Sequence, residues 1–259
     1  MTTINQIKKA AAITAVILIA TVFSCKKGGS SDNITTDGAV KSSIESGNGI
    51  TYKLYIKPGQ ASYKGILVMG SGNEPSQPSE GALDGDGENA LCQKAAENGY
   101  VAAIVKYRKG QPANTDDAWN SDANMLGQDY DNCIQALSVK YKVNKNRSVV
   151  GGYSYASMML FTVNSTYSTL AYCKGILGAC GASGQWDAQN FKIPIYAVNC
   201  AQADDQYGVN GKALYDLIPA NSPVKANSEG FTDNGCSTHC GKNWTDEMYA
   251  RLAKWLPIE

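Results

Sequence analysis

The stretch that decides the fold runs from Val149 to Ala156 and reads Val-Val-Gly-Gly-Tyr-Ser-Tyr-Ala. Its valines predict a short buried strand, and the apolar run 158–161 that follows predicts a helix. Gly152 and Ala156 stand two residues before and two after Ser154, and such small residues let the chain turn tightly from strand to helix. The pattern also occurs in ordinary Gly/Ser turns, but its place between strand and helix favours Ser154 as a nucleophile.

On both sides of this turn, apolar runs alternate with amphipathic stretches. Nearly continuous apolar runs are typical of buried parallel strands, and they occupy 65–70, 100–107, 148–152, 175–180 and 193–199. Spacings of three and four between apolar residues, with stop signals, predict helices at 88–98, 126–141, 154–163, 211–218 and 244–256. A leading antiparallel hairpin is predicted at 39–45 and 51–56. This order predicts an α/β fold: a mostly parallel, doubly wound sheet with flanking helices.

A serine hydroxyl needs a base to take its proton and a carboxylate to orient that base. His239 is the one histidine of the sequence, and it stands just before the last predicted helix. Asp204 and Asp205 follow the run 193–199, so serine, acid and histidine each come after a predicted strand. We predict a triad of Ser154, Asp204 and His239, and we favour Asp204 over Asp205 because the first acid of such a pair more often points into the site.

The loop after the first buried strand, Gly70-Ser71-Gly72, is rich in glycine. Glycine lets a backbone approach a substrate closely, so Gly72 is a candidate substrate-binding residue. We predict that the backbone N–H groups of Ser71 and Tyr155 form the oxyanion hole. The alternative is an ordinary glycine-rich turn.

The start of the chain resembles a bacterial lipoprotein signal. Lys8 and Lys9 precede an apolar run at 10–23, which has the length of a signal-peptide core. Cys25 is the predicted lipidation site, 1–24 the signal peptide, and 25–37 a flexible tether. The folded domain is then 38–259, anchored at the periplasmic or outer surface of a bacterial membrane only through its lipid. An uncleaved N-terminal anchor is the alternative.

Charge and cysteine usage narrow the function further. The sequence has 23 basic and 23 acidic residues, without a basic stripe that would attract nucleic acid. We expect a monomer without cofactor or metal. Seven cysteines remain besides Cys25, an odd number, so at least one is expected to be free. A zinc site from Cys200, Cys236, His239 and Cys240 is conceivable, but export favours disulfides.

The chain resembles the α/β-hydrolase superfamily from about residue 39 to 256, and its second half resembles dienelactone-hydrolase and cutinase-like esterases, polyester-degrading members included. The resemblance rests on Gly-Tyr-Ser154-Tyr-Ala and on the motifs Trp186-Asp187, Asn190-Phe191, Ile193-Pro194, Asp204, Leu214-Tyr215 and Thr238-His239. It implies the α/β-hydrolase fold without a large cap domain. It also implies a substrate-lining role for Trp186 and a disulfide from Cys200 to Cys240, or to Cys236, between the acid and histidine loops. Ala156, Tyr155 and Met69 depart from the family's usual glycine, methionine and histidine.

The sequence therefore predicts a secreted, lipid-anchored serine esterase acting on a small-molecule or polymeric ester. A carbohydrate esterase that removes acetyl or feruloyl groups is the second reading. A non-catalytic binding lipoprotein with the same fold is the third. Tyr107, Tyr153 and Tyr155 are candidates for an aromatic cleft together with Trp186. The acidic segment 84–88 is interpreted as a solvated loop that caps the next helix, and 116–117 as a loop feature. The segment 73–88 is a candidate rim of the cleft.

Overall fold

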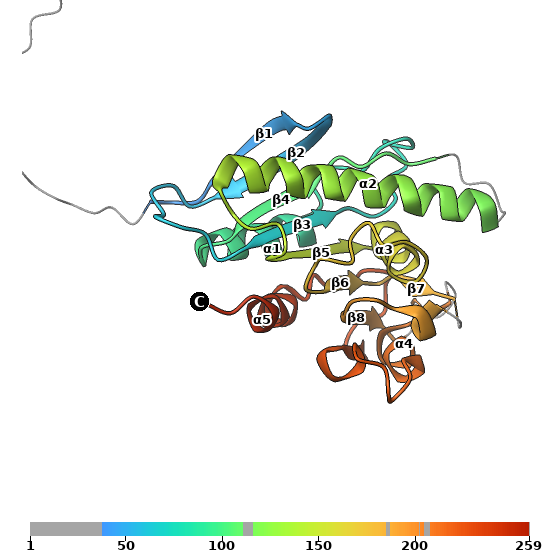
Figure 1. Cartoon of the computed structure of the whole chain (residues 1–259). Coiled ribbons are helices and arrows are strands. Elements are labelled where there is room, and N and C mark those ends of the chain that lie inside the picture. The colour runs from blue at the N-terminus through green and yellow to red at the C-terminus, as the bar shows by residue number, and fades with distance from the viewer. Residues whose placement is uncertain (1–37, 111–115, 185–186, 202, 205–207, 259) are drawn as a thin grey trace, which may run out of the picture. The chain divides into compact units, whose positions relative to one another are not determined.

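The computed structural model describes residues 38–110, 116–184, 187–201, 203–204 and 208–258. Eight strands form one sheet in the order β1-β2-β4-β3-β5-β6-β8-β10 (Figure 1). The strands are β1 Lys41–Gly47, β2 Ile50–Ile56, β3 Ile66–Gly70, β4 Val101–Val105, β5 Ser148–Tyr153, β6 Ile176–Ala179, β8 Ile195–Cys200 and β10 Glu229–Asp233. A small second sheet pairs β7 Ala182–Ser183 with β9 Val209–Asn210.

The sheet is parallel from β4 to β10 and antiparallel at β1 and β2. Every residue of β3, β4, β5, β6 and β8 is buried, which explains their continuous apolar runs. The chain leaves β3 toward β4 on one side and leaves β5 toward β6 on the other, so the strand order changes direction between β3 and β5. Crevices form at the carboxyl ends of strands at such a point. The predicted doubly wound sheet is confirmed.

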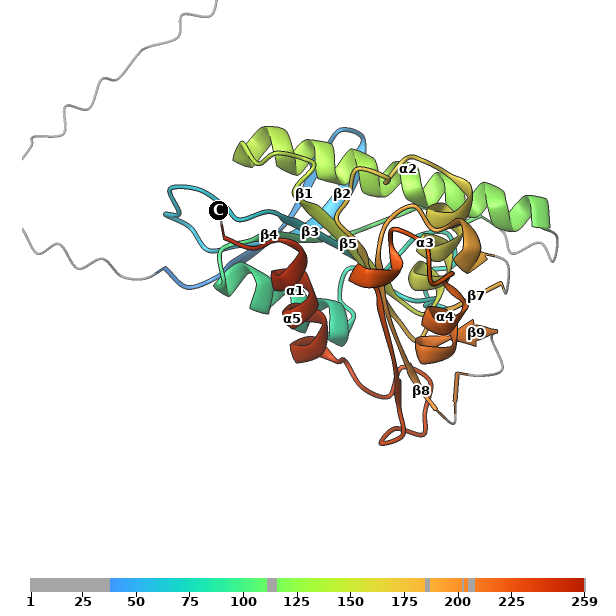
Figure 2. The ribbon, with the colours of Figure 1, turned by 60° about the horizontal axis from the view of Figure 1, so that its bottom comes forward.

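Helices cover both faces of the sheet (Figures 1 and 2). They are α1 Asp86–Glu97, α2 Asp116–Tyr141, α3 Tyr155–Thr166, α4 Gly211–Leu217 and α5 Thr245–Trp255, with short 3-10 turns at Asp187–Asn190 and Lys225–Asn227. One hydrophobic core lies between the sheet and α2, α3 and α4. A second core lies under α1 and α5, which pack side by side. The sheet is therefore the middle of three layers.

One sequence interpretation is wrong, and a second holds only in part. Asp116 and Asp117 belong to the first turn of α2, which is ten residues longer at its start than predicted. Their carboxylates suit a helix N-terminus, whose backbone carries partial positive charge. The segment 84–88 is only partly a solvated loop, because Asp86 begins α1 and Glu88 is buried.

The described helices include none that is long and apolar enough to cross a lipid bilayer. The predicted signal peptide, Cys25 and tether lie outside the described residues, so they stay predictions.

Candidate active site

Ser154 lies on the turn between β5 and α3, and it is the single residue that separates the strand from the helix. Its backbone has φ 48° and ψ −116°, a conformation that L-residues rarely adopt and that is typical of functional sites. Its N–H donates to the carbonyl of Ala179 at 2.8 Å, which ties the turn to β6. A Cβ at Gly152 would lie 2.7 Å from that of Ala156. The turn therefore requires glycine at position 152, because a larger residue would collide with Ala156.

A continuous chain of hydrogen bonds joins the three predicted triad residues. Ser154 Oγ lies 2.8 Å from His239 Nε2, and His239 Nδ1 lies 2.5 Å from Asp204 Oδ1. The side chain of Asp204 is fully buried, whereas that of His239 is 32 % exposed. The structure thus brings together residues separated by up to 85 positions in the sequence. Asp205 lies outside the described residues.

One backbone N–H and one side-chain amide hold Asp204 in place. Its second oxygen, Oδ2, accepts the N–H of Cys200 at 2.6 Å, and its carbonyl accepts the Asn210 amide at 2.9 Å. A carboxylate only accepts hydrogen bonds, so Oδ1 assigns the imidazole proton to Nδ1. Nε2 is then the unprotonated nitrogen that faces Ser154, which is the arrangement a general base requires.

The loop after β3 lies directly against the serine. A Cβ added to Gly72 would be 3.0 Å from Ser154 Cβ and 3.7 Å from Oγ. Two hydrogen bonds fix the neighbouring Ser71: its hydroxyl donates to Ala82 O at 3.0 Å, and its carbonyl accepts the Tyr107 hydroxyl at 2.6 Å. Hydrogen bonds therefore hold a glycine-rich loop against Ser154.

Of the three tyrosines suggested for an aromatic cleft, Tyr153 lines the cavity, whereas Tyr107 and Tyr155 do not. Tyr107 is fully buried, and its ring stacks on Tyr155 with centroids 6.4 Å apart. The Tyr155 hydroxyl donates to Asp122 of α2 at 2.8 Å, so this side chain braces the start of α3. Tyr153 does line the cavity at the site, and its hydroxyl donates to the carbonyl of Asn243. Trp186 lies outside the described residues.

The cysteine pairing differs from the first of the two possibilities considered. Cys200 bonds to Cys236, the second possibility, whereas Cys240 bonds to Cys180 at the end of β6. The Cys200–Cys240 pairing is therefore wrong, because each of these two cysteines is bonded to another sulfur. Cys92, Cys133 and Cys173 are free and buried, which agrees with the odd number.

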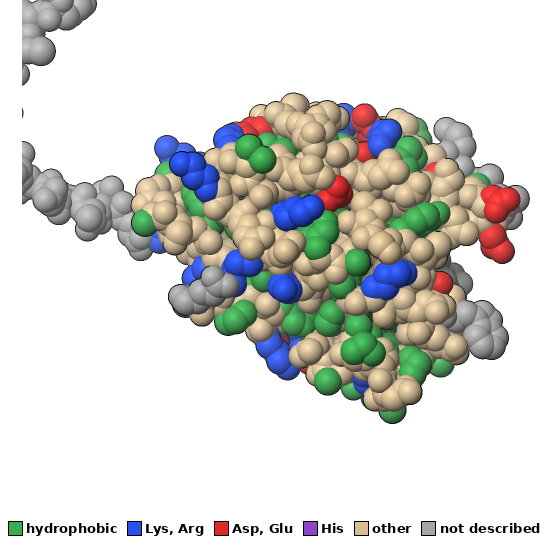
Figure 3. All heavy atoms as spheres, in the orientation of Figure 1, with side chains coloured by type: hydrophobic (Ala, Val, Ile, Leu, Met, Phe, Trp, Pro, Cys, Tyr) green, Lys and Arg blue, Asp and Glu red, His purple; other side chains and the backbone are tan. Residues whose placement is uncertain are grey.

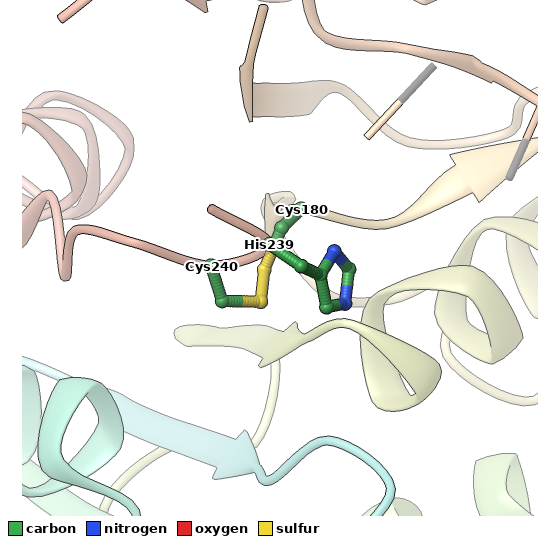
Figure 4. A group of neighbouring side chains, drawn as sticks. All are labelled: Cys180, His239 and Cys240. Atoms are coloured by element: carbon green, nitrogen blue, oxygen red, sulfur yellow. A yellow bond between two sulfur atoms is a disulfide. The ribbon is translucent and has the colours of Figure 1, made fainter. Parts of the chain in front are cut away.

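Both disulfides meet the triad loops. Cys200 lies beside Asp204, and Cys240 directly follows His239. Figure 4 shows the Cys180–Cys240 bridge at the base of His239, with the imidazole ring pointing away from it. These three residues are the one group among the described side chains whose potential ligand atoms lie close enough to share a metal ion. Because the two sulfurs are bonded to each other, neither offers the thiolate that zinc prefers.

A cavity of about 1080 Å³ opens at the serine. Ser71, Gly72, Ser154 and His239 all line it, together with parts of 73–88, as suggested for the rim. Carboxylate side chains are frequent in the lining, namely Glu74, Asp84, Asp86, Glu88, Asp246 and Glu247. The sequence interpretation missed this acidic wall because its members come from segments far apart in the chain.

Glu88 differs from the other acids in the wall, because it is only 4 % exposed. Burial, and then the negative charges of Asp86 and Asp84, raise the pKa of its carboxyl to about 7. The burial of Glu88 could not be predicted from the sequence, because exposed acids stand beside it in 84–88. No local pattern distinguishes the one acid whose side chain is buried.

No family model and no curated protein sequence matches the chain. Solved structures do match in three dimensions. A candidate dienelactone hydrolase from Klebsiella pneumoniae has a TM-score of 0.60 at 11 % identity, covering 85 % of this chain and 99 % of its own. A serine hydrolase without a lid from Xanthomonas campestris has a TM-score of 0.57 at 11 % identity, covering 88 % and 100 %.

A thermostable esterase from Pseudomonas putida is also similar, with a TM-score of 0.55, 12 % identity, and coverage of 86 % of this chain and 85 % of its own. Structural similarity at such low sequence identity shows that the folds are alike, but it does not show that the reactions are the same. The strand order, the flanking helices and these neighbours agree. The described residues have the α/β-hydrolase fold and include no large cap domain.

Proposed function

We propose that the protein is a serine esterase in which Ser154 is the nucleophile, His239 the general base and Asp204 the group that orients the base. The observation that carries the proposal is the hydrogen-bond chain from Ser154 Oγ through both imidazole nitrogens to Asp204, at the mouth of a cavity. The dienelactone hydrolase and esterase neighbours support the same reaction class. The strained backbone at Ser154 supports it further, since strain of this kind clusters at active sites.

In the first half of the reaction, Ser154 Oγ attacks the ester carbonyl carbon while its proton passes to His239 Nε2. Asp204 stabilises the imidazolium that forms. The carbonyl oxygen becomes an oxyanion, and the N–H groups of Ser71 and Tyr155 are the proposed donors to it. His239 then returns the proton to the alcohol oxygen as the C–O bond breaks, which leaves an acyl group on Ser154.

In the second half, water attacks the acyl carbon while His239 takes one of its protons. Collapse of the second oxyanion releases the carboxylic acid and restores the Ser154 hydroxyl. The proton transfers use Ser154, His239 and Asp204, which already lie within hydrogen-bonding distance of one another, and no step calls for a cofactor.

The lining favours a polar ester. A polar and charged wall is a poor match for long aliphatic chains, because it would lose hydration without gaining partners. This lining favours the carbohydrate-esterase reading over a polyester substrate. The sequence of residues 1–37 supports the further proposal that the enzyme is anchored to a bacterial membrane through a lipid on Cys25.

Hydrolysis of p-nitrophenyl acetate tests the proposal. Ser154→Ala is expected to abolish turnover, and Asp204→Asn to lower kcat by about 10³- to 10⁴-fold with the fold intact, because the wrong tautomer then faces the serine. Ser168→Ala, which changes an exposed serine outside the cavity, serves as the matched control and should keep full activity. Unchanged turnover in Ser154→Ala would refute the mechanism.

A further inference from the structure

The loops that lead into the strands of the main sheet carry basic side chains and no acidic ones. Because β4, β3, β5, β6, β8 and β10 are parallel, they all begin at one edge of the sheet, and the antiparallel β2 ends there. The loops that meet at this edge are 57–65, 98–100, 142–147, 167–175, 191–194 and 218–228. Their eight basic residues are Lys57, Lys64, Lys142, Lys145, Arg147, Lys174, Lys192 and Lys225. We refer to these loops together as the basic edge.

Little negative charge is available to neutralise the basic edge. Three acids lie within two residues of its loops in the sequence, namely Glu97, Asp216 and Glu229. Asp216 already pairs with Lys212, and Glu229 with Arg251. Four lysines of the edge form no ion pair with any acid that the structure describes: Lys64, Lys142, Lys145 and Lys174. Figure 3 shows Lys and Arg side chains clustered on the side of the molecule where the strands begin in Figure 1.

The chain enters the folded domain at the same edge. A Cβ at Gly38 would lie 3.3 Å from the carbonyl oxygen of Pro58, which belongs to the loop 57–65. Twelve residues, 26–37, separate Gly38 from Cys25, the proposed lipid site. A chain of that length reaches at most about 45 Å. A lipid on Cys25 would therefore keep the basic edge close to the surface of the bilayer.

The candidate active site lies at the other edge of the sheet. Ser154 directly follows the last residue of β5, and Asp204 and His239 come after β8 and β10. The cavity therefore opens where the strands end, away from the loops of the basic edge. Its lining is rich in carboxylates, so the two edges of the sheet carry charge of opposite sign. A negatively charged surface would attract the basic edge and repel the edge that holds the cavity.

We propose that the basic edge rests on an anionic phospholipid surface and turns the cavity away from the membrane. Two observations identify the partner: the edge carries charge of one sign, and the chain that leads to the proposed lipid enters the domain there. Each basic residue near an anionic bilayer adds to the attraction, which falls off within a Debye length. The inference rests on the proposed lipid on Cys25, and it adds an orientation to the proposed enzyme: the ester reaches Ser154 from the aqueous side.

Sedimentation with sucrose-loaded vesicles measures this contact without the lipid anchor. Both hydrophobic cores lie within residues 38–258, so a soluble protein that begins near Ser30 keeps the whole fold. The vesicles contain either phosphatidylcholine alone or phosphatidylcholine and phosphatidylglycerol in equal amounts. We expect the partition coefficient to be at least about 10-fold higher on the anionic vesicles at low ionic strength, and to decrease as added salt screens the lysines.

Two variants with the same net charge locate the contact. The first neutralises three exposed lysines of the basic edge, by Lys142→Gln, Lys145→Gln and Lys174→Gln. It should lower the partition onto anionic vesicles by about 10-fold or more. The matched control neutralises three lysines in β2, after β4 and at the start of α4, by Lys53→Gln, Lys106→Gln and Lys212→Gln. It should lower the partition by less than about 2-fold, because these charges lie away from the bilayer. Circular dichroism checks that each variant folds.

Equal partition onto neutral and anionic vesicles overturns the proposal. Equal losses in the two variants overturn it as well, because binding would then follow net charge and not the basic edge. Binding to a nucleic-acid duplex without binding to anionic vesicles would overturn it in favour of a nucleic-acid surface.

The orientation has its own readout. Vesicle-bound protein should keep its turnover of p-nitrophenyl acetate, whereas a loss of turnover on binding would place the cavity against the membrane and overturn the orientation. Vesicle binding itself does not depend on ester hydrolysis. A protein that binds anionic vesicles through the basic edge but is not labelled at Ser154 by a fluorophosphonate therefore disproves the esterase proposal alone.

Discussion

Replacing Glu88 by glutamine is expected to stabilise the folded protein at alkaline pH. At acidic pH the carboxyl is protonated, so removing its charge should change the stability little. Glutamine has nearly the same shape but never carries the charge that burial disfavours. The carboxyl is 4 % exposed, and Asp84 and Asp86 add negative charge beside it. The ionised form is therefore less stable in the folded protein than in the unfolded chain.

The magnitude follows from the pKa of the carboxyl, which rises from 4.5 to about 7 on folding. One pKa unit corresponds to about 1.4 kcal/mol, so ionised Glu88 destabilises the fold by about 3 kcal/mol. Below the unfolded pKa of 4.5, both states are protonated and the penalty is absent. It grows as pH rises between the two values and is complete above about 7, because the folded state then has to release its extra proton.

Urea unfolding with intact disulfides measures this difference. The gain in unfolding free energy of Glu88→Gln over wild type should be about 3 kcal/mol larger near pH 8.5 than near pH 4.5. Any constant effect of the new amide cancels in that comparison. Glu97→Gln, at an exposed position of α1, should show the same effect at both pH values. A gain for Glu88→Gln that does not change with pH would refute the reasoning.

Further predictions concern the framework around the triad. Replacing Cys180 and Cys240 together by serine should lower the unfolding free energy by up to about 4 kcal/mol, because the bridge closes a 60-residue loop, and thermal unfolding would measure it. Esterase activity should fall as well, since His239 loses its anchor; full activity would contradict that role. Gly152→Val would force its side chain against Ala156, and it should cost about 1–3 kcal/mol and nearly all ester hydrolysis. Normal turnover in that variant would show that the turn tolerates bulk.

Much of the fold could be predicted from local patterns of apolar residues in the sequence. Strands β3, β4, β5, β6 and β8 are buried on both faces, so their apolar residues run continuously and mark them clearly. Strand β10 was missed because it lies at the sheet edge, where half its residues face water. Its Phe231 is 43 % exposed, and its sequence has no apolar run. The start of α2 was missed because polar Asp122 takes an inward position that an apolar residue would normally mark.

The candidate triad was predictable because its residues follow strands whose ends meet at one edge of a parallel sheet. Their order in the sequence and the lone histidine were sufficient to name them. The pairing of Cys240 with Cys180 was not predictable, because it depends on which thiols fold within bonding distance. The acidic wall is likewise not visible in any local pattern, since Glu74, Glu88 and Glu247 line one cavity only when the loop after β3 and the packed helices α1 and α5 come together in the fold.

The central claim is that Ser154 is activated by His239, and covalent labelling tests it most directly. A soluble protein beginning near Ser30 would be treated with a fluorophosphonate, and intact mass would be followed over time. The account predicts one adduct on wild type, mapped to Ser154, absent in Ser154→Ala and greatly slowed in His239→Ala. A folded wild-type protein that stays unlabelled, or an adduct that persists in Ser154→Ala, would contradict it.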